Sequence, residues 1–91
     1  MITEIDYLKD VQVQESNDLN NEIVLYNDDV NTFDHVIDTL IMVCEHTVEQ
    51  AEQCAILVHY KGKCTVKTGS LKDLSPQCSL LLEAGLSAEI V

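Results

Sequence analysis

A stripe of apolar residues between positions 33 and 44 sets the strongest limit on how this chain folds. Its members recur at i, i+3, i+4, i+7, i+8 and i+11, the spacing of one face of an α-helix. Asn31 is a suitable N-cap just before the stripe, and Asp34 lies near the positive end of the helix dipole. The sequence therefore predicts a helix that buries Phe33, Val36, Ile37, Leu40, Ile41 and Cys44.

A second helix is predicted to begin shortly after the first. Thr47 and Gln50 have the spacing of a capping box, and Gly62 is a suitable stop. The turn over residues 55–58 is apolar nearly all round, so we expect it to be buried.

Three short strands are predicted around these helices. Residues 23–26 are an apolar run rich in β-formers, which is typical of a buried central strand. Apolar and polar residues alternate over 60–68 and again over 86–91, which indicates two half-buried strands.

A third helix is predicted between the last two strands. Ser75 and Pro76 have the signature of an N-cap followed by the first helical position, so the helix is expected over about 76–84, ending at Gly85. The order is then strand, helix, helix, strand, helix, strand. This order predicts an α+β fold, a small two-layer sandwich with a three-stranded sheet and helices on one face.

The charge of the chain is strongly negative and unevenly placed. The net charge is −11, there is no arginine, and residues 23–52 hold seven acids and no lysine. Nucleic-acid binding depends on clustered basic residues, so a nucleic-acid partner is disfavoured. The acidic half instead suits a cationic partner.

The cysteines and the first residues bear on compartment and domain organisation. The cysteines, at positions 44, 54, 64 and 78, lack the close spacing of a zinc or redox motif, so we expect reduced, packed thiols and no metal or cofactor. No apolar run approaches the ~20 residues that span a bilayer, and no secretion signal is recognisable. We expect a cytoplasmic monomer without membrane contact, with a flexible polar extension over residues 1–21 and one domain over 22–91.

The polar step Asn27-Asp28-Asp29 directly follows the first predicted strand. Such a step can be a solvated turn, or it can present acceptors to a cation. Other readings stay open from the residues alone. Cys54 or Cys64 with His59 could form a thiol nucleophile and base, and the acidic half could dock a basic partner. A metal site is a further possibility, with the ligands Asp28, Asp29, His35 and His59.

The motif "NDD" after a short strand, followed by two helices and "VHYKGK", resembles the ClpS family, and the resemblance spans residues 22 to about 68. It implies an adaptor that is not an enzyme. ClpS-like proteins bind the first residue of a substrate protein when it is a bulky hydrophobe, an N-degron. They deliver that substrate to a Clp AAA+ unfoldase of the ClpA or ClpC type for degradation.

The resemblance also implies which residues form the site. Asn27, Asp28 and His59 would contact the α-ammonium and the first peptide group, with Asp29 shaping the turn. The hydrophobic pocket would be lined by Asn31, Phe33, Val36, Ala55, Val58 and Leu86.

Two departures from the family pattern bear on the pocket and on delivery. The family commonly has Met at the positions of Phe33 and Ala55. The small Ala55 would leave room for a broader set of first residues, including Ile, unless Phe33 fills that space. The third helix, as predicted over 76–84, is shorter than usual, which would alter part of the surface that docks the unfoldase.

Overall fold

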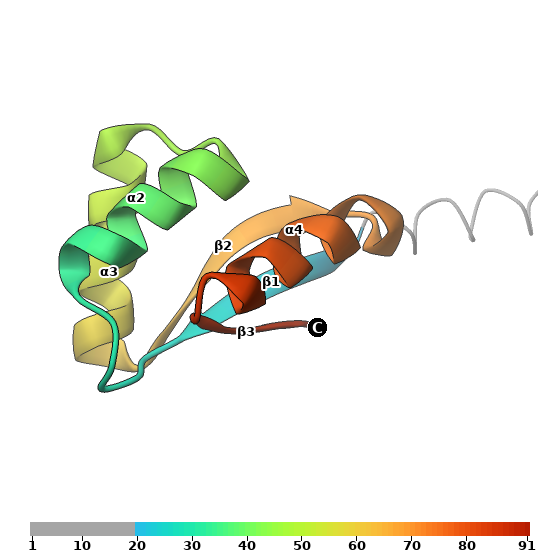
Figure 1. Cartoon of the computed structure of the whole chain (residues 1–91). Coiled ribbons are helices and arrows are strands. Elements are labelled where there is room, and N and C mark those ends of the chain that lie inside the picture. The colour runs from blue at the N-terminus through green and yellow to red at the C-terminus, as the bar shows by residue number, and fades with distance from the viewer. Residues whose placement is uncertain (1–19) are drawn as a thin grey trace, which may run out of the picture.

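The computed structural model describes residues 20–91, which form a three-stranded antiparallel sheet and three helices (Figure 1). The elements in chain order are β1 (Asn21–Tyr26), α2 (Phe33–Cys44), α3 (Val48–Lys61), β2 (Lys63–Gly69), α4 (Leu71–Glu83) and β3 (Ser87–Ile90). The predicted fold class and element order are confirmed. The predicted extension over residues 1–21 lies almost entirely outside the described residues. Only its end is seen, because β1 begins at Asn21, two residues before the predicted start.

Strand β1 is central in the sheet, which has the order β2-β1-β3. Its middle residues Ile23, Val24 and Leu25 are all buried, as expected for an apolar run with a neighbour on each side. The last residue of β1, Tyr26, is opposite Lys63 of β2 and Ser87 of β3. The end of β1 is therefore held by both edge strands, and the Asn-Asp-Asp step leaves the sheet from a fixed point.

The core lies between the sheet and the helices that cover one of its faces (Figure 1). Each helix contributes buried residues to this layer, and Leu40, Leu74 and Leu81 are almost completely inaccessible. The predicted burial of Phe33 and of the whole turn over 55–58 is wrong, because Phe33, Ile56 and Leu57 are 44%, 47% and 40% exposed. The buried cluster consists of Ile23, Leu25, Leu40, Cys44, Ala51, Val58, Val66, Leu74, Cys78, Leu81 and Leu86. Within the described residues all four cysteines are free thiols, two buried and two half-buried, as the sequence predicts.

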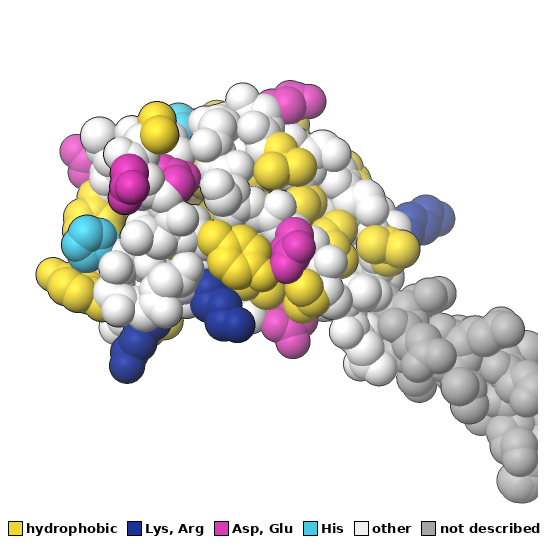
Figure 2. All heavy atoms as spheres, turned by 90° about the horizontal axis from the view of Figure 1, so that it is seen from below, with side chains coloured by type: hydrophobic (Ala, Val, Ile, Leu, Met, Phe, Trp, Pro, Cys, Tyr) yellow, Lys and Arg dark blue, Asp and Glu magenta, His cyan; other side chains and the backbone are white. Residues whose placement is uncertain are grey.

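The other face of the sheet carries polar pairs. The Tyr26 hydroxyl donates to a Glu89 carboxylate oxygen at 2.5 Å, and the Thr65 hydroxyl donates to Glu22 at 2.8 Å. The view from below in Figure 2 shows hydrophobic, acidic and basic side chains intermixed on that side of the molecule. Among residues 20–91, no helix is long and apolar enough to cross a membrane.

The predicted starts of α2 and β2 are wrong by one and three residues. Thr32, not Asn31, is the N-cap of α2, and its hydroxyl accepts from the backbone N–H of His35. Strand β2 begins at Lys63 rather than residue 60, because α3 continues to Lys61 before it ends at the left-handed Gly62. The capping box of α3 at Thr47 is confirmed.

The largest correction concerns α4, which begins five residues before the predicted start at Pro76. Ser70 caps the helix by accepting from the backbone N–H of Asp73, and Pro76 lies inside it. Proline removes one backbone donor there, but Leu74 on the earlier turn is buried in the core. Tertiary packing therefore outweighs the local signal of Ser75-Pro76, and the predicted start of this helix at residue 76 is wrong.

Candidate functional site

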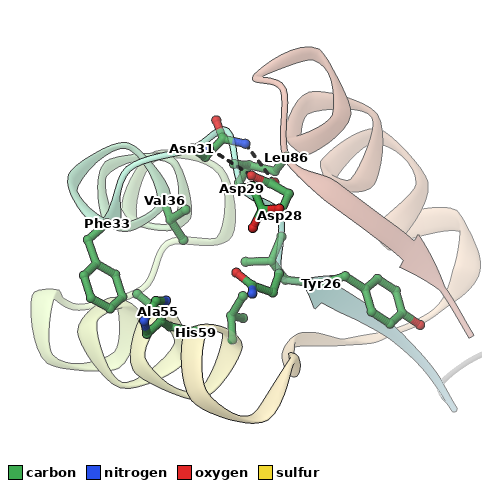
Figure 3. Close-up of a pocket in the computed structure, with 12 residues that line it drawn as sticks. Tyr26, Asp28, Asp29, Asn31, Phe33, Val36, Ala55, His59 and Leu86 are labelled. Atoms are coloured by element: carbon green, nitrogen blue, oxygen red, sulfur yellow. Dashed lines mark hydrogen bonds between the residues drawn. The ribbon is translucent and has the colours of Figure 1, made fainter.

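A pocket of about 340 Å³ lies where the end of β1, the first turn of α2 and the last turns of α3 meet (Figure 3). All nine residues that the sequence predicts for the site line it. Three further lining residues were missed or given another role: Leu25, Tyr26 and Asp29. The complete lining is Leu25, Tyr26, Asn27, Asp28, Asp29, Asn31, Phe33, Val36, Ala55, Val58, His59 and Leu86.

One side of the pocket is the turn between β1 and α2, and the Asp28 carboxylate organises it. Its Oδ1 accepts from the backbone N–H groups of Val30 and Asn31, both at 2.9 Å, and its Oδ2 accepts from the Asn31 amide at 2.9 Å. These bonds, led by the one from the Asn31 backbone, lower the pKa of Asp28 below its usual value. The carboxylate is therefore ionised at neutral pH and fixed in place.

The neighbouring Asp29 has a different environment. Its side chain is exposed and lines the pocket, and no hydrogen bond to it is found within residues 20–91. The sequence analysis gave the turn-shaping role to Asp29, whereas the structure gives that role to Asp28. Asp29 thus has both oxygens available to a ligand, while Asp28 contributes mainly a fixed negative charge.

Asn27 and His59 are far apart in the sequence but line the same pocket. The backbone N–H of Asn27 donates to the carbonyl of Gly62 at 3.0 Å, which ties the turn to the end of α3. His59 lies in the last turn of that helix, is exposed, and lines the same pocket. Its ring packs against Tyr60 with centroids 4.7 Å apart and nearly perpendicular planes. The two polar groups therefore face the pocket from rigid supports.

The rest of the pocket wall is apolar. Val58 and Leu86 are buried at 6% and 4% exposure, and Val36 is half-buried. Leu86 follows the turn after α4, so the C-terminal part of the domain closes one side. This wall has no basic side chain, and the acids Asp28 and Asp29 line the same pocket. The site combines an anionic rim with an apolar interior.

Phe33 occupies the space beside Ala55. Figure 3 shows its ring projecting from the start of α2 toward Ala55 and His59, and the Phe33 and His59 ring centroids are 5.4 Å apart. Ala55 is only 2% exposed, whereas Phe33 is 44% exposed at the pocket edge. Of the two alternatives from the sequence, the structure thus favours the one in which Phe33 fills the room left by alanine.

The thiol and metal alternatives receive no geometric support. Burial, followed by the neighbouring Cys64 thiol, raises the pKa of Cys54 to about 12, so Cys54 is a neutral thiol at pH 7. Neither cysteine lines the pocket. Within the described part of the chain, no group of three or more His, Cys, Asp or Glu side chains is arranged to hold a metal ion. His35 instead contacts the carbonyl of Ala84.

Comparison with known proteins gives consistent matches. The family model described as "ATP-dependent Clp protease adaptor protein ClpS" matches residues 16–89. An ATP-dependent Clp protease adapter protein ClpS from Thermosynechococcus vestitus is 33% identical over 69 residues, covering 75% of this chain and 73% of that protein.

A solved structure shares the fold at low sequence identity. It is Agrobacterium tumefaciens ClpS2 bound to L-phenylalaninamide, with a TM-score of 0.66 and 19% identity. The match covers 78% of this chain and 93% of that one.

Proposed function

This chain belongs to the ClpS family of adaptors of ATP-dependent Clp proteases, and we propose that it recognises substrate proteins by a bulky hydrophobic first residue, an N-degron. Adaptors of this family regulate a protease and are not themselves enzymes. The observation that carries the proposal is one pocket of about 340 Å³ that joins an anionic rim to an apolar interior. The first residue of a protein has both groups that such a pocket can bind, because its α-ammonium and its side chain are attached to the same carbon atom.

In this proposal the rim binds the α-ammonium. The amine has a pKa of about 7.7–8.0 and is therefore mostly protonated at neutral pH. Asn27 and His59 offer polar groups, Asp29 offers an uncommitted carboxylate, and Asp28 adds a fixed negative charge. An internal peptide group is neutral and has chain on both sides, so it cannot replace the ammonium. The rim thus selects for a free chain end.

The apolar interior then takes the first side chain. Phe33, Val36, Ala55, Val58 and Leu86 line this part of the pocket, together with the polar Asn31. A buried Leu or Phe contributes roughly 1.5–3 kcal/mol, and a charge-assisted hydrogen bond a similar amount. After ordering and association costs, binding in the micromolar range is expected. The L-phenylalaninamide bound to the Agrobacterium protein has the same two chemical groups, a free α-amine and an apolar ring, which supports this assignment.

Membership of the ClpS family implies that a Clp protease is the partner of this chain. We propose that the unfoldase of this protease is an AAA+ protein of the ClpA or ClpC type. The adaptor would act as a monomer in the cytoplasm, carrying the bound N-degron to that unfoldase. Degradation of a reporter with an N-terminal Phe by each purified unfoldase with its protease, with and without the adaptor, tests this step. Equal degradation rates with and without the adaptor for both unfoldases would refute it.

Fluorescence anisotropy with labelled peptides tests the binding step. A peptide that begins with Phe and has a free amine should bind, while its N-acetylated form and a peptide with internal Phe should bind at least about tenfold more weakly. Asp29→Asn should weaken binding, whereas Asp38→Asn, an exposed acid of α2 outside the pocket, serves as the matched control.

The same assay separates N-degron binding from docking of basic partners by the acidic surface. Equal binding of free and acetylated peptides, with affinity that falls steeply with salt and rises with peptide basicity, would refute the proposal in favour of that alternative.

A further inference from the structure

The turn between α4 and β3 is held to the first helix by two side chains of α2 and its N-terminal flank. Helix α4 ends at Glu83, with Ala84 as its C-cap, and Gly85 has a left-handed φ of 89°. The backbone N–H groups of this turn are satisfied within it: Gly85 donates to Leu82 and Leu86 donates to Leu81. The carbonyls at the end of a helix, in contrast, have no partner within the helix.

Asn31 and His35 provide partners for two successive carbonyls of this turn. The Asn31 side-chain amide donates to the Gly85 carbonyl at 2.8 Å, and His35 Nε2 lies 2.8 Å from the Ala84 carbonyl. A carbonyl can only accept, so His35 carries its proton on Nε2. Asn31 uses its amide nitrogen twice, because it also donates to the Asp28 carboxylate at 2.9 Å. We call Asn31, His35 and the two carbonyls the turn clamp.

The turn clamp acts on the next residue, Leu86, which is 4% exposed and forms a wall of the pocket. Leu86 is the only lining residue that comes from the C-terminal side of β2, so its distance from α2 decides how wide the pocket is on that side. His35 does not line the pocket, so its effect on a bound apolar side chain is indirect, and its contact with the Ala84 carbonyl directs that effect to the turn before Leu86.

We propose that His35, together with Asn31, is a positioning residue that fixes Leu86 against α2 and thereby sets the size of the first residue that the pocket accepts. This inference rests on the proposed function and adds to it a determinant of selectivity outside the pocket. When the clamp is released, Leu86 can move away from α2. A small first residue such as Leu then loses contact with one wall, while a Trp side chain is large enough to keep it.

The test compares peptides that begin with Leu and with Trp, both with free amines, on wild type and on His35→Ala by fluorescence anisotropy. His35→Ala should weaken the Leu peptide about threefold or more relative to the Trp peptide, the effect expected from one lost hydrogen bond. His35→Gln, whose amide can donate in place of Nε2, should restore the wild-type ratio. His46→Ala is the matched control, because His46 Nε2 also contacts a carbonyl, that of Val66 at 2.7 Å, far from the pocket lining.

A clamp that only stabilises the fold gives a different result. His35→Ala would then lower the midpoint of thermal unfolding and weaken both peptides by one factor, and the unchanged ratio would overturn the proposal. A double-mutant cycle with Leu86→Ala adds a second criterion. If His35 acts through Leu86, His35→Ala should leave the ratio unchanged in that background, and an undiminished effect there would also overturn the proposal. Failure of wild type to bind any free-amine peptide would instead refute the proposed function itself.

Discussion

Replacing Phe33 by alanine removes the aromatic ring that covers Ala55 at the edge of the pocket. The room beside Ala55 then becomes available to the Cβ substituents of a bound first residue. We expect the wild-type protein to prefer Leu over the β-branched Ile at that position, and Phe33→Ala to lose most of this preference.

The magnitude follows from the burial of the ring. Phe33 is 44% exposed, so its truncation should cost about half of the ~3–5 kcal/mol measured for fully buried Phe, or about 2 kcal/mol in the free energy of unfolding. A bound Ile has a methyl group on Cβ that Leu lacks. Forcing this group against a fixed Phe33 ring costs about 1–3 kcal/mol of binding free energy, which corresponds to roughly 5- to 150-fold discrimination against Ile. Without the ring, the ratio of the Leu and Ile affinities should fall to about fourfold or less, which corresponds to the burial free energy of one methylene group.

The assay is anisotropy with two peptides that differ only in Leu or Ile at the first position, at a temperature at which both proteins are folded. Tyr60→Ala is the matched control, because the Tyr60 ring also packs on His59 but is 74% exposed and does not line the pocket. An Ile-to-Leu ratio that is the same in wild type, Phe33→Ala and Tyr60→Ala, with all three binding Leu, would refute the idea that Phe33 forms this wall.

Three other predictions use simpler measurements. Peptide affinity should fall as the pH rises above about 8, close to tenfold per pH unit, because the α-amine loses its proton. An affinity that does not change between pH 7 and pH 9 would argue against ammonium recognition. Asp28 has a lowered pKa in the folded state, so its ionised form stabilises the fold above the unfolded value of 3.8, and this contribution is lost as the pH falls below it. Urea denaturation should therefore show Asp28→Asn to be less stable than wild type at pH 7 and closer to it at pH 3, whereas an equal difference at both would contradict this account. Burial raises the pKa of Cys54 to about 12, so iodoacetamide at pH 8 should alkylate it much more slowly than an unperturbed thiol, as followed by mass spectrometry. Rapid labelling of Cys54 would show that its thiol is not shielded.

The features that sequence reasoning predicted correctly are those with local causes. The capping box of Thr47 and Gln50 needs only residues three apart, and the apolar stripe of α2 needs only helical spacing. The element order followed from such signals. The start of α4 did not, because Pro76 is a strong local marker, and only the burial of Leu74 in the core reveals that the helix begins earlier.

The features that were missed depend on long-range contacts. Asn31 and Thr32 are both good N-caps, but the Asn31 side chain is engaged elsewhere, by Asp28 and by Gly85, which is 54 residues away. His35 has no sequence signal at all for its contact with Ala84, 49 residues away.

The site itself could not be assembled from residue spacing alone. The resemblance to ClpS proteins named nine site residues, and each of them lines the pocket. Spacing, in contrast, does not say that Leu86 and Val36 line one pocket, because that depends on how α4 and β3 return to the sheet. The exchange of roles between Asp28 and Asp29 is also invisible in the sequence, since both are acids in one turn and differ only in which way their oxygens point.

The central place of β1 affects the protein during its synthesis. The strand order β2-β1-β3 means that the acidic turn after β1 leaves the ribosome long before Leu86, which closes the pocket, and before β3, which pairs with β1. A nascent chain that has reached only the end of α3 displays the rim of the site without its far wall. The proposed binding site is therefore complete only once the chain has been synthesised beyond Leu86 and β3 has paired with β1.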